Sequence, residues 1–107
     1  MDELTPKSNL EIVISIKKEM DGSIIFSSRG HSVPGVCAAV STLMAGMYAF
    51  LVNNLKENAV VGWKGPKSGV FDLTCPYQFR READYLVFNL KLLAENYPIY
   101  TRIVELT

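Results

Sequence analysis

Alternating hydrophobic and polar residues near the N-terminus predict a β-hairpin. Apolar side chains recur at every second position, the period of a strand with one buried face, at Leu10, Ile12, Ile14 and Ile16. The pair Asp21-Gly22 predicts a turn, because glycine tolerates a positive φ, and a second strand then runs from residue 24 toward Gly30. Residues 1–9 are polar and predict a loose N-terminal lead-in.

A long apolar helix is predicted to follow, ending at about residue 54. Residues 30–55 contain no Asp, Glu, Lys or Arg, Pro34 and Gly35 mark the start, and Ser32 is available as a capping oxygen. A helix that is apolar around most of its circumference must be covered on more than one side, by the sheet, a second helix or another subunit. The run 36–52 is at the lower length limit for a membrane span, so we interpret it as a buried helix and expect no membrane association.

The second half of the chain predicts another hairpin, an amphipathic helix and a last strand. Residues 59–64 and 70–74 predict strands, 65–69 a turn, and 99–106 a final strand. Between them, from Pro76 to Pro98, a 3.6-residue period predicts a helix whose buried stripe is Phe79, Ala83, Leu86, Val87, Leu90, Leu93, Ala94 and Tyr97. A second apolar stripe is predicted to meet the first helix or a partner chain, at Tyr85, Phe88 and Leu92.

These elements predict an α+β domain spanning residues 1–107, in the order ββαββαβ, with a largely antiparallel mixed sheet and two helices packed on it. Eleven basic and eleven acidic residues give no net charge, which argues against direct nucleic-acid binding. Two cysteines are too few for a disulfide scaffold, and the N-terminus lacks the pattern of a signal peptide. We therefore expect a cytoplasmic protein with reduced thiols.

The candidate chemistry lies where the hairpin meets the apolar helix. His31, the single histidine, precedes Cys37 by six residues, and Cys37 falls in the predicted first turn of the helix. A helix N-terminus and an imidazole both stabilise a thiolate, and free N–H groups of the first turn can serve as an oxyanion hole. The residues alone also fit a buried apolar cysteine and a surface histidine.

Two other side chains have alternative interpretations. Ser41 lies one turn after Cys37, where its hydroxyl either hydrogen-bonds near the sulfur or holds a water there, or instead bonds back to the Cys37 carbonyl. Cys75 shares strand parity with two apolar residues, so core packing is its expected role. A zinc site built from His31, Cys37 and Cys75 would lack a fourth ligand, and we expect neither a metal nor a cofactor.

The segment Gly-His-Ser-Val-Pro-Gly-Val-Cys-Ala-Ala-Val-Ser, residues 30–41, resembles the signature of the ribosomal-processing cysteine proteases, the Prp family. The preceding hairpin and the closing segment 92–100, a helix end followed by Tyr-Pro and a strand, are also similar to that family. The resemblance implies a small homodimer that cleaves the N-terminal extension from a large-subunit bacterial ribosomal protein. It implies Cys37 as the nucleophile and His31 as the general base and acid, with support from Ser41, Gly30 and Gly35.

The loop 33–36 differs from the longer, aspartate-containing loop of many family members. A second hypothesis is therefore a non-catalytic relative that binds a ribosomal protein or peptide. A third is a structural dimer held together by the apolar helix.

Overall fold

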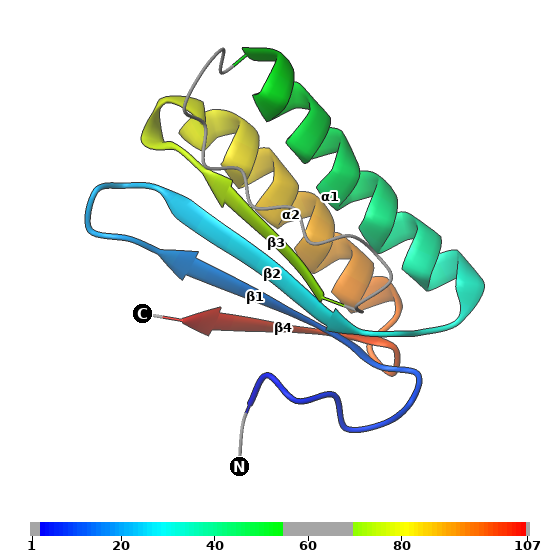
Figure 1. Ribbon diagram of the computed structural model, residues 1–107. Coiled ribbons are helices and arrows are strands. Elements are labelled where there is room, and N and C mark those ends of the chain that lie inside the picture. The colour runs from blue at the N-terminus through cyan, green and yellow to red at the C-terminus, as the bar shows by residue number, and fades with distance from the viewer. Residues whose placement is uncertain (1–2, 55–69, 107) are drawn as a thin grey trace.

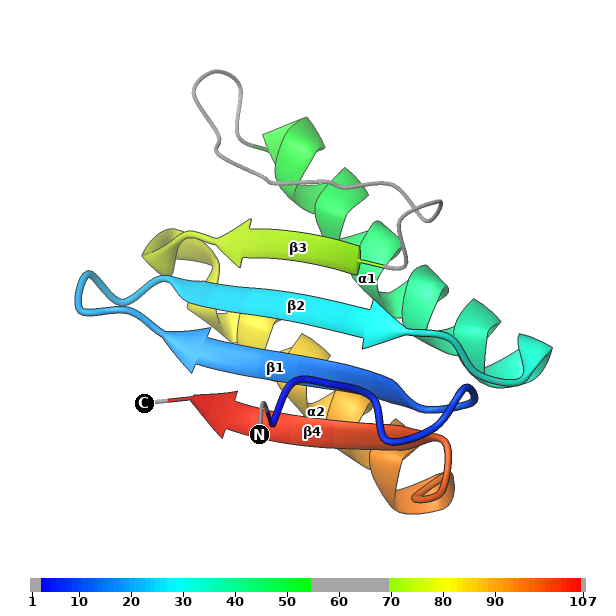
Figure 2. The same ribbon diagram turned by 60° about the horizontal axis from the view of Figure 1, so that its bottom comes forward.

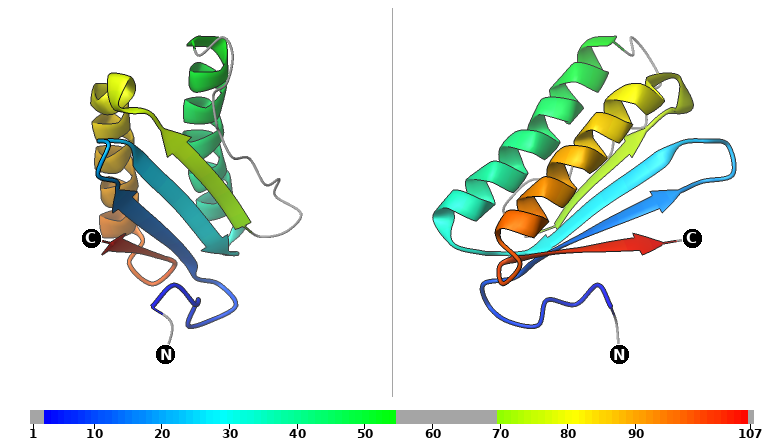
Figure 3. Two further views of the ribbon diagram at one scale, coloured as in Figure 1. Left: turned by 60° about the vertical axis from the view of Figure 1, so that its left-hand side comes forward. Right: turned by 180° about the vertical axis from the view of Figure 1, so that it is seen from behind.

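In residues 3–54 and 70–106, the part that this computed structural model describes, four strands form one mixed sheet and two α-helices cover one of its faces (Figures 1 and 3). The elements run in the order β1 (Ile12–Lys18), β2 (Ile24–Gly30), α1 (Pro34–Asn54), β3 (Val70–Cys75), the 3-10 helix η2 (Tyr77–Phe79), α2 (Arg80–Asn96) and β4 (Thr101–Leu106). The predicted α+β class is confirmed. The strand predicted at 59–64 and the turn at 65–69 lie outside the described residues.

The strand order is β3-β2-β1-β4, so β1 and β2 occupy the centre of the sheet (Figure 2). β2 pairs antiparallel with both of its neighbours, whereas β1 and β4 pair in parallel, with Ile14 opposite Ile103. Parallel neighbours need a long crossover connection, and here the chain between them supplies β2, β3 and both helices.

β1 is buried on both faces. The prediction that only one of its faces is buried is therefore wrong. Ile12, Ile14 and Ile16 point into the core beneath the helices, and Val13 and Ser15 are buried on the opposite side. The reason is position: β1 has a strand on each side, and the chain preceding it crosses the face that the helices leave open (Figure 2). The strand also begins at residue 12 rather than at Leu10, which is exposed.

The core lies between the sheet and the helices. The sheet contributes Phe26 and Leu73, which are fully buried, and α1 contributes Met44 and Leu51 from one side. Each such side chain stabilises the fold by about 1.5–3 kcal/mol on burial. α2 completes the core with Ala83, Leu86 and Leu90, as its predicted stripe indicated.

α1 is less covered than predicted. By length and composition it is apolar enough to cross a membrane, yet only Val36, Val40, Met44 and Leu51 are buried. Its outward positions expose mostly small or hydroxyl-bearing side chains, namely Ala38, Ser41, Thr42, Gly46 and Ala49. The absence of charge therefore reflects a face of small residues rather than burial on several sides.

The second helix starts later than predicted. Pro76 precedes η2, and its carbonyl accepts the Phe79 N–H at 3.0 Å, so regular α-helix begins only at Arg80. At the other end, the Tyr97 carbonyl accepts N–H groups from residues 100 and 101 in a tight turn. Because of this turn, β4 starts at Thr101, two residues after the predicted start at Ile99. Ile99 itself is exposed.

An ion pair ties the N-terminal lead-in to the sheet. The Arg102 guanidinium donates to the Glu3 carbonyl at 2.8 Å, to the Thr5 carbonyl at 3.2 Å and to Glu11 Oε1 at 3.3 Å. The Lys7 N–H donates to the same Glu11 oxygen at 2.8 Å. The lead-in has no regular secondary structure, but these hydrogen bonds fix it against the sheet.

The Glu11 carboxylate is predicted to make stability pH-dependent. Burial alone would raise the pKa of Glu11, but the Lys7 N–H and the Arg102 guanidinium lower it below its usual value of 4.5. A lowered pKa contributes stability that is present above the unfolded value and is lost as the pH falls through the folded value. Glu11→Gln should reduce the free energy of unfolding by about 1 kcal/mol at pH 7, and this difference should be smaller at pH 3, which lies below the unfolded pKa.

Urea titrations at both pH values measure this difference. The matched control is Glu19→Gln, because the Glu19 ion pair with Lys17 is exposed and long, at 3.9 Å. Equal losses for the two variants would contradict a special role for Glu11.

Candidate active site

The candidate site begins where β2 ends at Gly30. This residue has φ +96°, a conformation that glycine adopts without strain. A Cβ at this position would collide with the Glu11 carbonyl oxygen and lie 2.8 Å from Pro6 Cγ. Glycine is therefore required here by both the backbone conformation and the close approach of the N-terminal lead-in.

The loop after Gly30 folds back onto the sulfur of Cys37. The Ser32 N–H lies 3.1 Å from Cys37 Sγ, and the Cys37 thiol can donate to the Ser32 carbonyl at 3.2 Å. Cys37 is half-buried. The backbone of one loop residue thus holds the sulfur at the start of α1.

Fewer backbone N–H groups are free at the start of α1 than the predicted oxyanion hole requires. The N–H groups of Val36 and Cys37 both donate to the Val33 carbonyl at 3.0 Å, so the Cys37 amide is not available to an oxyanion. Pro34 has no N–H, and in the described residues the Gly35 amide forms no hydrogen bond. Gly35 is exposed, and a Cβ added there would meet no atom within 4 Å, so its amide is the candidate donor to a bound anion.

The side chain of Ser32 does not cap the helix, contrary to the prediction. Its hydroxyl oxygen is buried and has no hydrogen-bond partner within the described chain. The sequence did not predict that the Ser32 backbone contacts the sulfur, because every residue type has the same main-chain N–H and carbonyl groups.

His31 is exposed and, among the residues that the structure covers, forms neither a hydrogen bond nor an ion pair. It borders a shallow hollow of about 480 Å³ formed with the lead-in residues Pro6, Lys7, Ser8 and Asn9. The structure therefore places His31 in the loop between β2 and α1 and Cys37 in the first turn of α1, and within the described residues no hydrogen bond joins the imidazole to the sulfur.

Ser41 is exposed, and its hydroxyl makes neither of the two predicted hydrogen bonds in the described structure. Both interpretations of this residue are therefore unsupported. Within the same residues, no three His, Cys, Asp or Glu side chains gather as metal ligands.

Cys75 is a core residue. It is 1% exposed, and its thiol lies 3.5 Å from the Phe79 carbonyl. Burial, together with the nearby carboxylates of Glu82 and Asp84, raises the pKa of the Cys75 thiol to about 11. The predicted packing role is confirmed.

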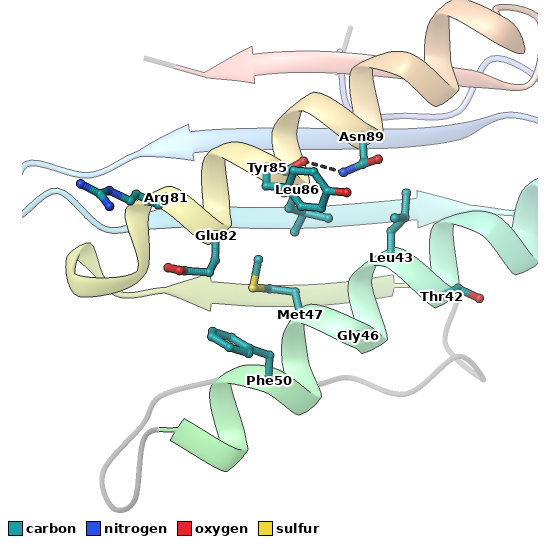
Figure 4. A pocket seen from close by; sticks show the side chains of 10 residues that line it. All are labelled: Thr42, Leu43, Gly46, Met47, Phe50, Arg81, Glu82, Tyr85, Leu86 and Asn89. Carbon is teal, nitrogen blue, oxygen red and sulfur yellow. Dashed lines mark hydrogen bonds between the residues drawn. The ribbon is translucent and has the colours of Figure 1, made fainter.

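A separate apolar groove lies between the two helices and includes neither His31 nor Cys37. Its volume is about 460 Å³. Figure 4 shows Leu43 and Met47 of α1 pointing toward Leu86 and Glu82 of α2. The other lining residues are Thr42, Gly46, Phe50, Arg81, Tyr85 and Asn89.

No family model and no curated protein matches this chain. Solved structures do match it. The ribosomal processing protease Prp from S. aureus, in complex with a substrate peptide, superposes with a TM-score of 0.73 at 16% identity, over 89% of this chain and 99% of that one. The chain has the fold of this protease.

Two further structures agree with this result. The same protease with a covalently linked product peptide gives a TM-score of 0.74 at 17% identity, again over 89% of this chain and 99% of that one. SMU.848 from Streptococcus mutans gives 0.64 at 17% identity, over 91% of this chain and 97% of its own. The resemblance to the Prp family that the sequence indicated is thus confirmed at the level of the fold.

Gly30→Ala is predicted to destabilise the protein by about 1–3 kcal/mol, because alanine would be strained at this φ and would displace the Glu11 backbone. Gly35→Ala is the matched control, since nothing lies near that position; its effect should stay within about 1 kcal/mol. Urea denaturation monitored by circular dichroism measures both. A loss at position 35 as large as that at position 30 would refute the steric argument.

Iodoacetamide is predicted to modify native Cys37 and spare Cys75. With a pKa of about 11, Cys75 is thiolate in only about one molecule per thousand at pH 8, and it is also inaccessible. Mass spectrometry of the intact protein should show one adduct in buffer and two in urea. Simultaneous modification of both cysteines in the native protein would contradict this assignment.

Proposed function

We propose that this protein is a cysteine endopeptidase that removes the N-terminal extension of a large-subunit bacterial ribosomal protein during ribosome assembly. The observation that carries the proposal is the anchored sulfur of Cys37 at the start of α1, directly after the loop that bears His31. The fold likeness to a ribosomal processing protease crystallised with a substrate peptide supports this class of reaction.

In the proposed reaction, the His31 imidazole takes the proton of the Cys37 thiol, and Sγ attacks the carbonyl carbon of the scissile peptide bond. The oxygen of the tetrahedral intermediate accepts a hydrogen bond from the free Gly35 amide. His31 then returns the proton to the leaving amine as the C–N bond breaks. A water molecule, deprotonated by His31, hydrolyses the thioester and regenerates the thiol.

This reaction requires a side-chain movement. Because His31 is exposed and makes no hydrogen bond in the described structure, rotation of its side chain toward Cys37 breaks no interaction. The approach of an imidazole competes only with the contacts that Ser32 makes to the sulfur. Catalytic hydrogen bonds often form only once substrate is bound.

The wider proposal has three parts. The partner is the precursor peptide of the ribosomal protein rather than nucleic acid, consistent with a chain of no net charge. The protein acts in the cytoplasm without a membrane, where α1 serves as a core helix through Val36, Val40, Met44 and Leu51. It forms a homodimer.

The second candidate is a non-catalytic relative that binds a ribosomal protein or peptide. It is favoured by the contacts that occupy the sulfur on both sides while His31 remains unpaired in the described structure. The two candidates differ in the pH dependence of Cys37 alkylation. A midpoint near the free thiol value of about 8.5 supports the binding protein, and a midpoint well below it that His31→Ala abolishes supports the protease.

The decisive test is cleavage of the full-length ribosomal protein with its N-terminal extension. The wild-type protein should release the extension, and Cys37→Ala should reduce the rate by at least about a thousandfold, because the nucleophile is lost. Cys75→Ala is the control and should retain cleavage, since Cys75 only packs in the core. Intact substrate with the wild type, or equal cleavage by Cys37→Ala, would refute the proposal; mass spectrometry reads each outcome.

A further inference from the structure

The N-terminal lead-in forms part of the hollow that His31 borders. The volume of this hollow is about 480 Å³. Its lining residues are Pro6, Lys7, Ser8 and Asn9 of the lead-in, and Gly30 and His31 of the segment that leads to α1. The side chain that serves as base and acid in the proposed reaction therefore borders a concave surface that the lead-in helps to build.

The lead-in part of the hollow is held in place by the sheet. Arg102 and Glu11 bind its main chain, and the Glu11 carboxylate accepts the Lys7 N–H at 2.8 Å. Pro6 lies close to Gly30 because glycine has no side chain; a Cβ at Gly30 would lie 2.8 Å from Pro6 Cγ. The hollow is therefore present in the folded chain before a ligand binds, which lowers the entropic cost of binding one.

The lining residues of the hollow include one lysine and no acid. Within the described residues, the exposed Lys7 ammonium forms no ion pair, and the main-chain N–H groups of Ser8 and Asn9 donate no hydrogen bond. The nearby Glu11 carboxylate is already paired with Arg102, at 3.3 Å. The hollow thus combines a positive charge with hydrogen-bond donors that have no protein partner in this part of the chain.

We propose that this hollow binds an acidic side chain of the peptide substrate, with Lys7 as a specificity-determining residue. The carboxylate lies against the Lys7 ammonium, and the N–H groups of Ser8 and Asn9 are the donors available to its oxygens. The inference rests on the proposed function, in which His31 protonates the leaving amine, so the residues after the scissile bond pass closest to His31. An extended peptide advances about 3.3 Å per residue, so we expect the acidic residue within about two positions after that bond.

Other side chains fit the hollow less well. An apolar side chain would remove water from Lys7 and from the unpaired N–H groups without replacing the lost hydrogen bonds. A basic side chain would meet the like charge of Lys7. A carboxylate replaces the lost water contacts and is also attracted by the ammonium.

Cleavage of matched peptides tests this specificity. The peptides span the scissile bond of the ribosomal protein and carry Asp, Asn or Lys at the first or the second position after it. The wild type should cleave the Asp peptide with a kcat/KM about two- to fivefold above that of the Asn peptide at one of the two positions, the range of an exposed ion pair. The Lys peptide should be the poorest substrate. NaCl at about 0.5 M should reduce the preference, because salt screens exposed charges.

Variants of Lys7 separate specificity from folding. Lys7→Gln keeps the main-chain N–H that Glu11 accepts, and it should cleave the Asp and Asn peptides equally. Lys7→Glu should reverse the order, so that the Lys peptide becomes the best substrate. Lys18→Glu is the control, since Lys18 is exposed at the opposite end of β1, and it should keep the wild-type order. A purely structural role of Lys7 would lower all rates together and leave their order unchanged.

A binding measurement makes the test independent of catalysis. With Cys37→Ala, fluorescence anisotropy of the same labelled peptides gives their Kd values without cleavage, and the Asp peptide should bind most tightly. If the wild type cleaves no peptide but Cys37→Ala binds them in this order, the protease proposal fails and the acidic site stands. Equal rates and affinities for the Asp and Asn peptides, an order that survives Lys7→Glu, or no binding of any peptide would overturn the inference.

Discussion

The parallel pairing of β1 with β4 is the contact on which the rest of the structure depends. It joins the first strand to the last and places Ile14 beside Ile103 at the sheet–helix interface. It also brings Arg102 to Glu11, which fixes the N-terminal lead-in against the sheet. Since this lead-in packs against Gly30, the position of the loop before α1 depends on the last strand of the chain.

The position of this loop in turn determines which groups surround the Cys37 sulfur. The N–H and the carbonyl of Ser32 both contact the Cys37 sulfur, which limits the rotation of this side chain at the start of α1. His31 has no such contact in the described residues; it lies in the loop between β2 and α1, whereas Cys37 lies in the first turn of α1. In the proposed reaction, substrate binding would therefore have to bring the imidazole to the sulfur.

The inner and outer faces of the helical layer differ in character. The inner faces of α1 and α2 bury a conventional core against the sheet, and the outer face of α2 carries a row of apolar residues between a base and an acid. The charges of Arg81 and Glu95 cost stability in the isolated helix, because each lies at the wrong end of the dipole.

The sequence by itself determined the α+β class, the described helices and strands to within a few residues, and the junction of β2 with α1 that carries His31 and Cys37, because hydrophobic periodicity, Pro and Gly positions and a local motif are short-range signals. The burial of both faces of β1, the anchoring of Cys37 by Ser32 and the Glu11–Arg102 ion pair were decided only by the tertiary structure. Each depends on which strands become neighbours or on main-chain atoms. Residue type encodes neither, since every residue has the same backbone and strand partners lie up to about 90 positions away.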